Sequence, residues 1–271
     1  MRLSGCKFSN AFCILNCVLC MALSGCAARA ISFPTDSGVP LTDYATVHAE
    51  VSKACSGART LTAELSLSGR AGSQRLRGRV VAGFDRPASM RLEGVAPFGS
   101  PAFILVARDM EATLLLPRDN AVLRDAQAAD ILAALTGVSL APADLQAVLT
   151  GCVEPSPDAV TGRLHANGWA SVDLKGGATL FLRRDGRGWR VQSARRGEWE
   201  IEYPAWQGRF PQSVRLRSRN PQVNVDLSAT LAQLETNIEI AAEAFTVNVP
   251  TGAVRITLDE LRNAGPLRTD E

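Results

Sequence analysis

Apolar and polar residues alternate with a period of two in many separate segments of this 271-residue chain. Leu61, Ala63 and Leu65 begin one such segment, and the residues between them are polar. This pattern is typical of antiparallel strands that have one face on the core and one face in water. The segments predicted as strands are 61–68, 75–84, 90–93, 103–106, 113–116, 120–124, 169–174, 179–183, 189–192, 198–203, 214–219 and 223–229.

The period becomes helical in three short segments, 42–57, 126–135 and 142–149. Glycines at 57, 137 and 151 follow these segments and are expected to end the helices. An open sheet of about eleven or twelve strands curls, and its apolar face needs a cover. The fold class predicted is therefore mainly β (α+β), a curled antiparallel half-barrel with short helices over its concave face. Residues 153–167 are predicted to form a polar loop.

The N-terminus carries Arg2 and Lys7, followed by a short apolar stretch at 11–23. That order is typical of a signal peptide, and the stretch is too short to span a bilayer comfortably. It ends in Leu-Ser-Gly before Cys26, which resembles the lipobox of bacterial lipoproteins. The resemblance implies that Cys26 carries covalent diacylglycerol and an N-acyl lipid and that cleavage occurs before it. The alternative is an ordinary signal peptide cleaved near Ala28.

Cleavage before Cys26 would remove four of the seven cysteines, and lipid would occupy Cys26 itself. Cys55 and Cys152 are then the cysteines left in an oxidising compartment, where they can form a disulfide. A disulfide across so long a loop would stabilise the fold by roughly 4–5 kcal/mol. The alternative is that each is a separately buried small hydrophobe.

The predicted organisation is a signal peptide at 1–25, a lipidated cysteine and flexible tether at 26–41, a single domain at 42–262 and a tail at 263–271. Without residues 1–25, basic and acidic side chains are equal in number. A neutral chain is a poor candidate for steered binding to nucleic acid, so we expect no nucleic-acid partner. We expect a monomer.

No P-loop, nucleophile elbow or zinc-protease helix motif occurs in the sequence. The chain has two histidines, His48 and His165, and a zinc site or a Ser-His-Asp triad would need one of them beside suitable partners. His48 is expected on a helix surface. Glu198, Glu200 and Glu202 alternate along one segment opposite Arg215, Arg217 and Arg219 of another, which favours a solvated charge ladder between strands over an acid–base site. We therefore expect no enzyme, no metal and no cofactor.

The order of a lipobox, a helix, six strands, two helices and further strands resembles outer-membrane lipoprotein receptors of the LolB type, in the LolA–LolB superfamily. The closest local similarities are a turn at 95–100 (VAPFGS) and the segment 141–151 (APADLQAVLTG). The resemblance implies an acyl-chain-binding protein on the periplasmic face of the outer membrane. Its partners would be membrane lipid, a periplasmic lipoprotein carrier and lipoprotein cargo.

In LolB-type proteins a protruding leucine at the matching turn is implicated in delivering cargo to the bilayer. By this resemblance Pro97, Phe98 and Gly99 would form a membrane-insertion loop with Phe98 at its tip. Aromatic rings favour the interfacial layer of a bilayer, which suits this role. The alternative is that Phe98 folds back as a hydrophobic plug over the end of the sheet.

Two other functions compete with the LolB-like one. The same sheet would serve in a non-catalytic envelope-assembly or structural lipoprotein that binds protein partners. An envelope hydrolase is the third hypothesis. The sequence does not distinguish an open acyl-chain cavity from a packed core.

Overall fold

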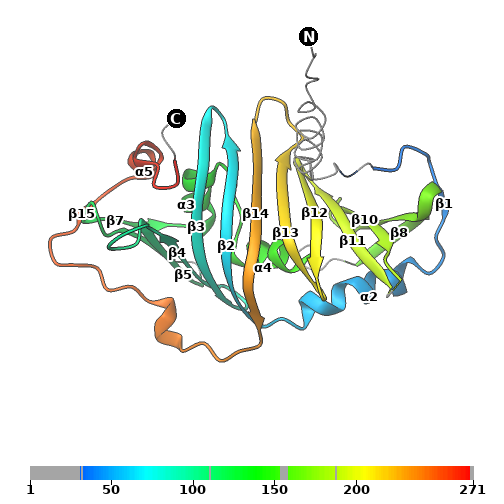
Figure 1. Ribbon diagram of the computed structural model, residues 1–271, viewed down its shortest axis with the longest axis horizontal. Coiled ribbons are helices and arrows are strands. Elements are labelled where there is room, and N and C mark those ends of the chain that lie inside the picture. The colour runs from blue at the N-terminus through cyan, green and yellow to red at the C-terminus, as the bar shows by residue number, and fades with distance from the viewer. Residues whose placement is uncertain (1–30, 32, 110, 153–157, 187, 269–271) are drawn as a thin grey trace, which may run out of the picture. The chain divides into compact units, whose positions relative to one another are not determined.

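The computed structural model describes residues 31, 33–109, 111–152, 158–186 and 188–268, and residues 31–271 form one compact unit. The predicted signal peptide and Cys26 lie outside the described residues. Within the described part, 15 strands form one sheet (Figure 1). The strands are β1 (Val39–Pro40), β2 (Thr60–Ala71), β3 (Gln74–Asp85), β4 (Ser89–Val95), β5 (Phe103–Arg108), β6 (Glu111–Leu116), β7 (Ala121–Ala126), β8 (Ala159–Leu164), β9 (Trp169–Leu174), β10 (Thr179–Arg184), β11 (Trp189–Arg196), β12 (Trp199–Gln207), β13 (Phe210–Ser218), β14 (Val225–Thr236) and β15 (Val254–Arg255).

The sheet consists of two antiparallel meanders, β2 to β7 and β8 to β14, joined where β14 pairs with β2. Short edge strands complete it, with β1 antiparallel to β8 and β15 parallel to β7. The helices are α2 (Tyr44–Ser56), α3 (Ala128–Thr136), α4 (Pro142–Thr150) and α5 (Leu258–Ala264), with short 3₁₀ turns at Ala166–Gly168 and Ala242–Phe245. The predicted fold class is confirmed.

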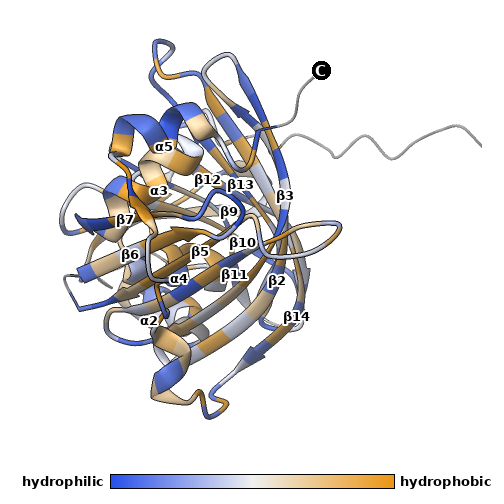
Figure 2. Ribbon diagram, turned by 90° about the vertical axis from the view of Figure 1, so that its left-hand side faces the viewer, coloured by the Kyte–Doolittle hydropathy of each residue, from blue (hydrophilic) through white to orange (hydrophobic). Residues whose placement is uncertain are grey.

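The helices lie on the concave side of the sheet, as Figure 2 shows for α3 and α5. Gly137 and Gly151 end α3 and α4 in the left-handed conformation, as the sequence predicts. The alternation of β2 and β3 brings apolar side chains such as Leu65 and Val80 onto the same concave side, where the core forms. No helix among the described residues is long and apolar enough to cross a bilayer.

The prediction of a polar loop at 153–167 is wrong from Ala159 onward, because β8 occupies Ala159–Leu164. The strand lacks an apolar alternation since its one buried residue is Gly162. A Cβ at Gly162 would lie 2.4 Å from the Cβ of Tyr44, so the first helix packs directly on the strand backbone. Helix α2 fills the space that an inward apolar side chain fills in other strands. The strand therefore shows no alternation of apolar and polar residues in the sequence.

Parts of the predicted tether at 26–41 and of the predicted tail at 263–271 pack against the sheet. Before α2, Phe33 packs edge-on against Phe181 with ring centroids 5.1 Å apart, and Val39 pairs with Leu164 in β1. The prediction of a flexible tether is therefore wrong for residues 33–40, and its first part lies outside the described residues. At the other end, Leu267 is 4% exposed in the core and Arg268 pairs with Leu76, so the domain extends past residue 262.

Candidate functional site

A cavity of about 130 Å³ lies between the concave face of the sheet and helices α3 and α4. All its lining residues are apolar except Thr136 and Ser228. They come from both meanders, from both helices and from the C-terminal segment. They are Leu65, Leu67, Val80, Leu92, Phe103, Leu132, Leu135, Thr136, Val138, Leu140, Leu145, Val148, Leu149, Val214, Leu216, Leu227, Ser228, Ala229 and Leu267.

The size and lining of this cavity suit an apolar ligand. An engineered cavity of about 150 Å³ lined by Leu, Ile and Phe stays dry and binds benzene. The cavity here is similar in volume and offers no charged side chain to water. It therefore has room for a short stretch of hydrocarbon, and a longer chain would need the helices to move away from the sheet.

The turn between β4 and β5 presents Phe98 to solvent. The Phe98 residue is 88% exposed, so the alternative that it plugs the end of the sheet is wrong. Pro97 and Pro101 flank the tip, and Gly99 adopts a φ of 74° that favours glycine. A large apolar side chain at such a position has no intramolecular reason to be exposed.

Arg118 fixes this turn from the neighbouring hairpin between β6 and β7. Its Nη2 donates to the Phe98 carbonyl oxygen at 2.7 Å, and its Nε donates to the Ser100 carbonyl oxygen at 3.3 Å. No local pattern in the sequence points to Arg118, because the two hairpins become neighbours only in the folded sheet. The contact holds the backbone beneath Phe98 and leaves its ring free.

Cys152 follows α4 and takes part in a disulfide bond. Its Sγ lies 4.0 Å from the carbonyl oxygen of Ser52, one helical turn before Cys55 on α2. The Cys55 side chain lies outside the described residues, so its pairing with Cys152 stays a prediction. Ser52 belongs to the C-terminal half of α2, so this part of the helix lies beside Cys152.

His165 links the N-terminal segment to the sheet through a chain of hydrogen bonds. Its Nδ1 lies 3.0 Å from Asp36 Oδ1, and its Nε2 lies 2.9 Å from Ser171 Oγ. Asp36 also accepts from the backbone N–H groups of Gly38 and Ala166. The hydrogen bond with His165 is the main cause that lowers the pKa of Asp36.

This order of Asp, His and Ser is that of a serine hydrolase triad, but the surroundings do not suit catalysis. Ser171 is 6% exposed in the middle of β9, which leaves no approach for a substrate carbonyl. Its neighbours in β8 and β10 use the backbone N–H groups of β9 in the sheet, so no donors point at a developing oxyanion. The three residues form a structural clasp.

His48, on α2, is half-buried, and burial lowers its pKa.

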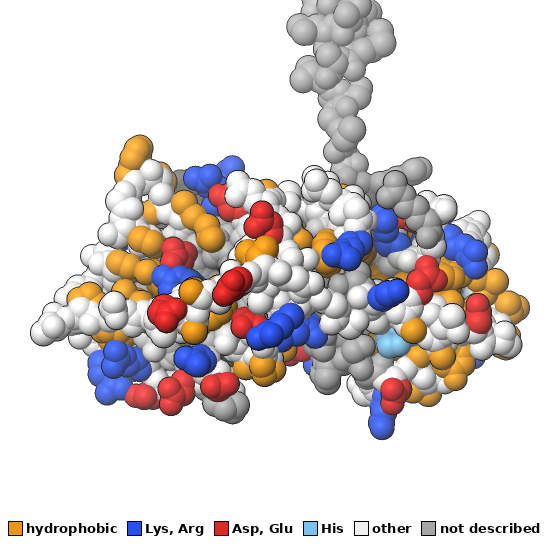
Figure 3. Space-filling view, turned by 90° about the horizontal axis from the view of Figure 1, so that it is seen from below, with side chains coloured by type: hydrophobic (Ala, Val, Ile, Leu, Met, Phe, Trp, Pro, Cys, Tyr) orange, Lys and Arg blue, Asp and Glu red, His pale blue; other side chains and the backbone are white. Residues whose placement is uncertain are grey.

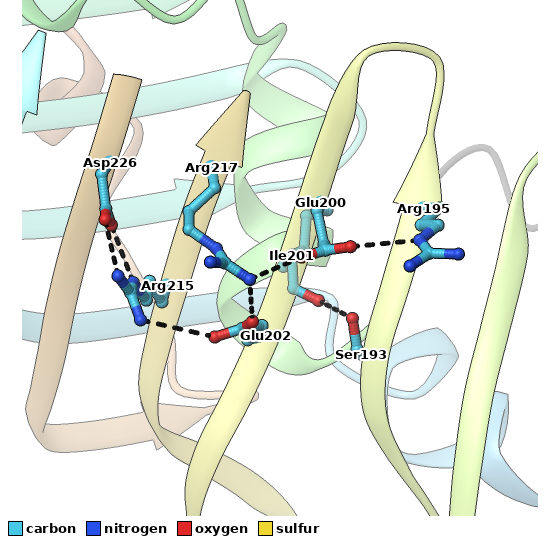
Figure 4. A network of polar contacts seen from close by, with 8 residues as sticks. All are labelled: Ser193, Arg195, Glu200, Ile201, Glu202, Arg215, Arg217 and Asp226. Carbon is cyan, nitrogen blue, oxygen red and sulfur yellow. Dashed lines mark hydrogen bonds and ion pairs between the residues drawn. The ribbon is translucent and has the colours of Figure 1, made fainter. Parts of the chain in front are cut away.

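A network of charged side chains crosses four strands on the outer face of the sheet (Figure 4). Arg217 pairs with both Glu200 and Glu202, and its distance to Glu200 is 2.6 Å. Arg195 pairs with Glu200 at 3.1 Å, and Arg215 binds Asp226 through two hydrogen bonds. The register places Glu200 opposite Arg217 and Glu202 opposite Arg215, so the predicted cross-strand pairing is confirmed for these residues.

The prediction that this ladder is solvated is wrong for its carboxylates. The side chains of Glu200 and Glu202 are only 10% and 3% exposed. Arginines of β11 and β13 pair with Glu200, and two arginines of β13 pair with Glu202. Burial raises the pKa of Glu202, although Arg217 and Arg215 act in the opposite direction. Glu198 lies apart from the network at an exposed turn. All carboxylates of the network are engaged by arginines, which suits a structural role.

Among the described residues, no group of three or more His, Cys, Asp or Glu side chains lies close enough together to hold a metal ion. The site residues that the structure brings out are thus of two kinds. One kind lines the apolar cavity on the concave side, and the other, Phe98 with Arg118, forms an exposed tip at one end of β4.

No protein-family model matches the sequence, and no curated protein matches it. Among solved structures, the chain is similar to a DUF1329 family protein from Desulfovibrio piger, with a TM-score of 0.52, 11% identity, and coverage of 76% of this chain and 97% of that chain. A LolA superfamily protein from Nitrosomonas europaea aligns with a TM-score of 0.48 and 8% identity over 74% of this chain and 97% of that chain. The first of these likenesses shows a shared fold.

The clasp predicts a local effect of Asp36→Ala. Loss of the carboxylate removes the partner of His165 and of two backbone N–H groups, so residues 33–38 should loosen. Hydrogen exchange in this segment should quicken by about tenfold, while the core strands stay protected. Ser37→Ala is the control, and equal exchange in the two variants would contradict the role of the clasp.

Because the pKa of Asp36 is lowered, the wild-type clasp should hold above roughly pH 4 and loosen as pH falls below that value.

The network predicts a pH-dependent cost of Arg217→Gln. Removing this arginine leaves Glu200 and Glu202 with less compensation, and we expect a loss of about 2 kcal/mol in unfolding free energy at pH 7. A raised pKa means that Glu202 takes up its proton more readily in the folded state, so the loss relative to wild type should shrink as pH falls toward 5.

Urea unfolding of both proteins across this pH range measures the effect. The control is Arg219→Gln, one residue past the end of the same strand, whose exposed side chain should matter by less than about 0.5 kcal/mol. A loss for Arg217→Gln that grows toward low pH would contradict the assignment of Glu202 as the group that responds.

Proposed function

We propose that this protein is a lipoprotein, anchored through Cys26 to the periplasmic face of the outer membrane, that binds acyl chains and assists lipoprotein insertion there, as LolB-type receptors do. The observation that carries the proposal is the apolar cavity between the sheet and helices α3 and α4. The lipobox-like sequence before Cys26 supports the anchor, which would consist of diacylglycerol and an N-acyl chain.

Acyl chains fit the cavity chemically. Each CH₂ group moved from water into an apolar site contributes about 0.8 kcal/mol, so affinity grows with the length of chain enclosed. The lining of leucine and valine side chains offers many partners to hydrocarbon and no buried charge that would oppose it. The anchored protein's partners would be membrane lipid, lipoprotein cargo and a periplasmic carrier that delivers it.

Phe98 supplies the contact with the bilayer in this proposal. The ring stands clear of the domain, and Arg118 holds the backbone beneath it. An aromatic side chain placed in this way enters the interfacial layer of a membrane favourably. The turn of Pro97, Phe98 and Gly99 is thus the insertion loop, through which bound chains pass toward the bilayer.

Filling the cavity should abolish acyl-chain binding. Ala229→Phe adds a ring to a lining residue of β14 and should weaken binding of a fluorescent fatty acid by at least about tenfold, at a stability cost of about 1–3 kcal/mol. The protein tested begins at Ala27, since every residue of the described core lies between Val47 and Leu267.

The matched control is Ala232→Phe, which makes the same change on the same strand at an exposed position. It should bind the fatty acid as the unchanged protein does. Equal binding by both variants would remove the cavity from the proposal, and no binding by the unchanged protein would favour the non-transporting assembly lipoprotein instead.

Phe98→Glu should separate binding from delivery. The ring is exposed, so the variant should keep its stability within about 0.5 kcal/mol and bind the fatty acid normally. Transfer of the bound fatty acid into liposomes should slow by about tenfold, because a carboxylate resists entry into the membrane interface. Val254→Glu, which changes another exposed apolar residue, is the control. Normal transfer by Phe98→Glu would contradict the insertion role.

A further inference from the structure

The outer face of β2 and β3 carries a row of exposed arginines, which we call the arginine row and define as Arg70, Arg75, Arg77 and Arg79. On β3 they alternate with Leu76 and Val80, which are buried, so their side chains lie on the face opposite the cavity. Arg70 lies directly opposite Arg75 in the register of the two strands. Like charges at such positions destabilise a sheet.

The carboxylates of the described residues do not balance the arginine row. Arg79 lies 4.0 Å from Glu64, a distant and exposed pair, and the other three form no ion pair with any described carboxylate. Asp226 lies opposite Arg70 in the sheet, but both of its oxygens accept hydrogen bonds from Arg215. Among the described residues, the row therefore has an excess of positive charge, whereas in the neighbouring network on β11 to β14 three arginines meet three carboxylates.

The arginine row adjoins the loop that carries Phe98. Arg79 pairs with Val95, the last residue of β4, and the chain then enters the turn of Phe98. Arg77 lies two residues before Arg79 on β3, in the part of the strand that has no β4 partner. Arg118, exposed at the foot of the turn, adds a further positive charge that donates to backbone carbonyls and to no described carboxylate. An apolar tip and a surplus of guanidinium groups thus share one region.

We infer that the arginine row binds anionic lipid headgroups, so that the domain docks on a negatively charged membrane surface beside Phe98. Guanidinium groups bind phosphate through paired hydrogen bonds, and a bilayer with anionic lipids attracts each basic side chain near it. The inference rests on the proposed role of Phe98 at a membrane and adds the charge of the lipid that is recognised.

The arrangement fits a membrane better than an acidic protein. Its charges are spread over the exposed outer face of β2 and β3, and an exposed aromatic ring stands at the edge of that face. The surface seen from below carries basic and acidic side chains mixed together, so it lacks this bias (Figure 3). Because the arginines lie on one face only, docking through the arginine row would set the orientation of the domain on the membrane as well as attract it there.

The test compares vesicles of phosphatidylcholine with vesicles that also contain phosphatidylglycerol, using the protein that begins at Ala27. The double variant Arg75→Gln and Arg77→Gln should bind the anionic vesicles about thirtyfold more weakly, because one basic residue near such a surface is worth roughly a fivefold gain in partitioning. Binding to neutral vesicles should not change. High salt should weaken the unchanged protein toward the level of the variant.

The control removes the same charge elsewhere, with Arg108→Gln and Arg124→Gln at exposed positions of β5 and β7. If both double variants lose affinity equally, net charge alone is responsible and the inference fails. It also fails if the unchanged protein does not prefer anionic vesicles, or if the arginine row binds an acidic polypeptide such as polyglutamate but not the vesicles. Fatty-acid binding by the unchanged protein is measured in parallel. If the unchanged protein binds anionic vesicles but no fatty acid, the proposed function fails and the inference about the arginine row stands.

Discussion

The pairing of β2 with β14 is the interaction on which the rest of the structure depends. It runs from Leu61 opposite Thr236 to Ala71 opposite Val225, and it joins the two meanders into one sheet. Gly69 lies within it at a φ of 145°, where a Cβ would come 2.1 Å from the Asp226 carbonyl oxygen. The strands approach so closely there that only glycine fits. Without this pairing each meander would expose half of an apolar face, and the cavity, which takes its lining from both, would not form.

The sequence predicts most of the sheet because a strand with one wet face must alternate, and alternation is visible in the residues. It misses strands whose inner face is not made by apolar side chains. In β8 the inward position is Gly162, covered by Tyr44, and β1 and β15 have two residues each, too few for any period. These edge strands are recognised only when their neighbours are in place.

The site was predicted unevenly for a related reason. Proline and glycine around Phe98 predicted a turn outside the ladder, and the exposed ring agrees with that. The contacts of Arg118 with the Phe98 turn, and of Asp36 with His165, join residues that are far apart in the chain. No local sequence pattern predicts such contacts. The alternation of Glu200 and Glu202 correctly predicted their outer face, yet their burial arises from arginines on neighbouring strands.

The two faces of the sheet differ in a way that suits the proposed binding of acyl chains at a membrane. The cavity on the concave face is lined almost entirely by apolar side chains and by no charged ones, which is the surrounding that hydrocarbon favours. The outer face, in contrast, has positive charge left over on β2 and β3 after the network on β11 to β14 is satisfied. Phe98 belongs to neither face, since it stands at the loop between β4 and β5.

An apolar ring on a free loop would fold back onto nearby apolar surface, because burial is favourable. The hydrogen bonds from Arg118 oppose that movement by fixing the carbonyl groups on both sides of Gly99. The exposed ring is therefore maintained by the fold, which is the condition for a residue that must meet a partner outside its own chain.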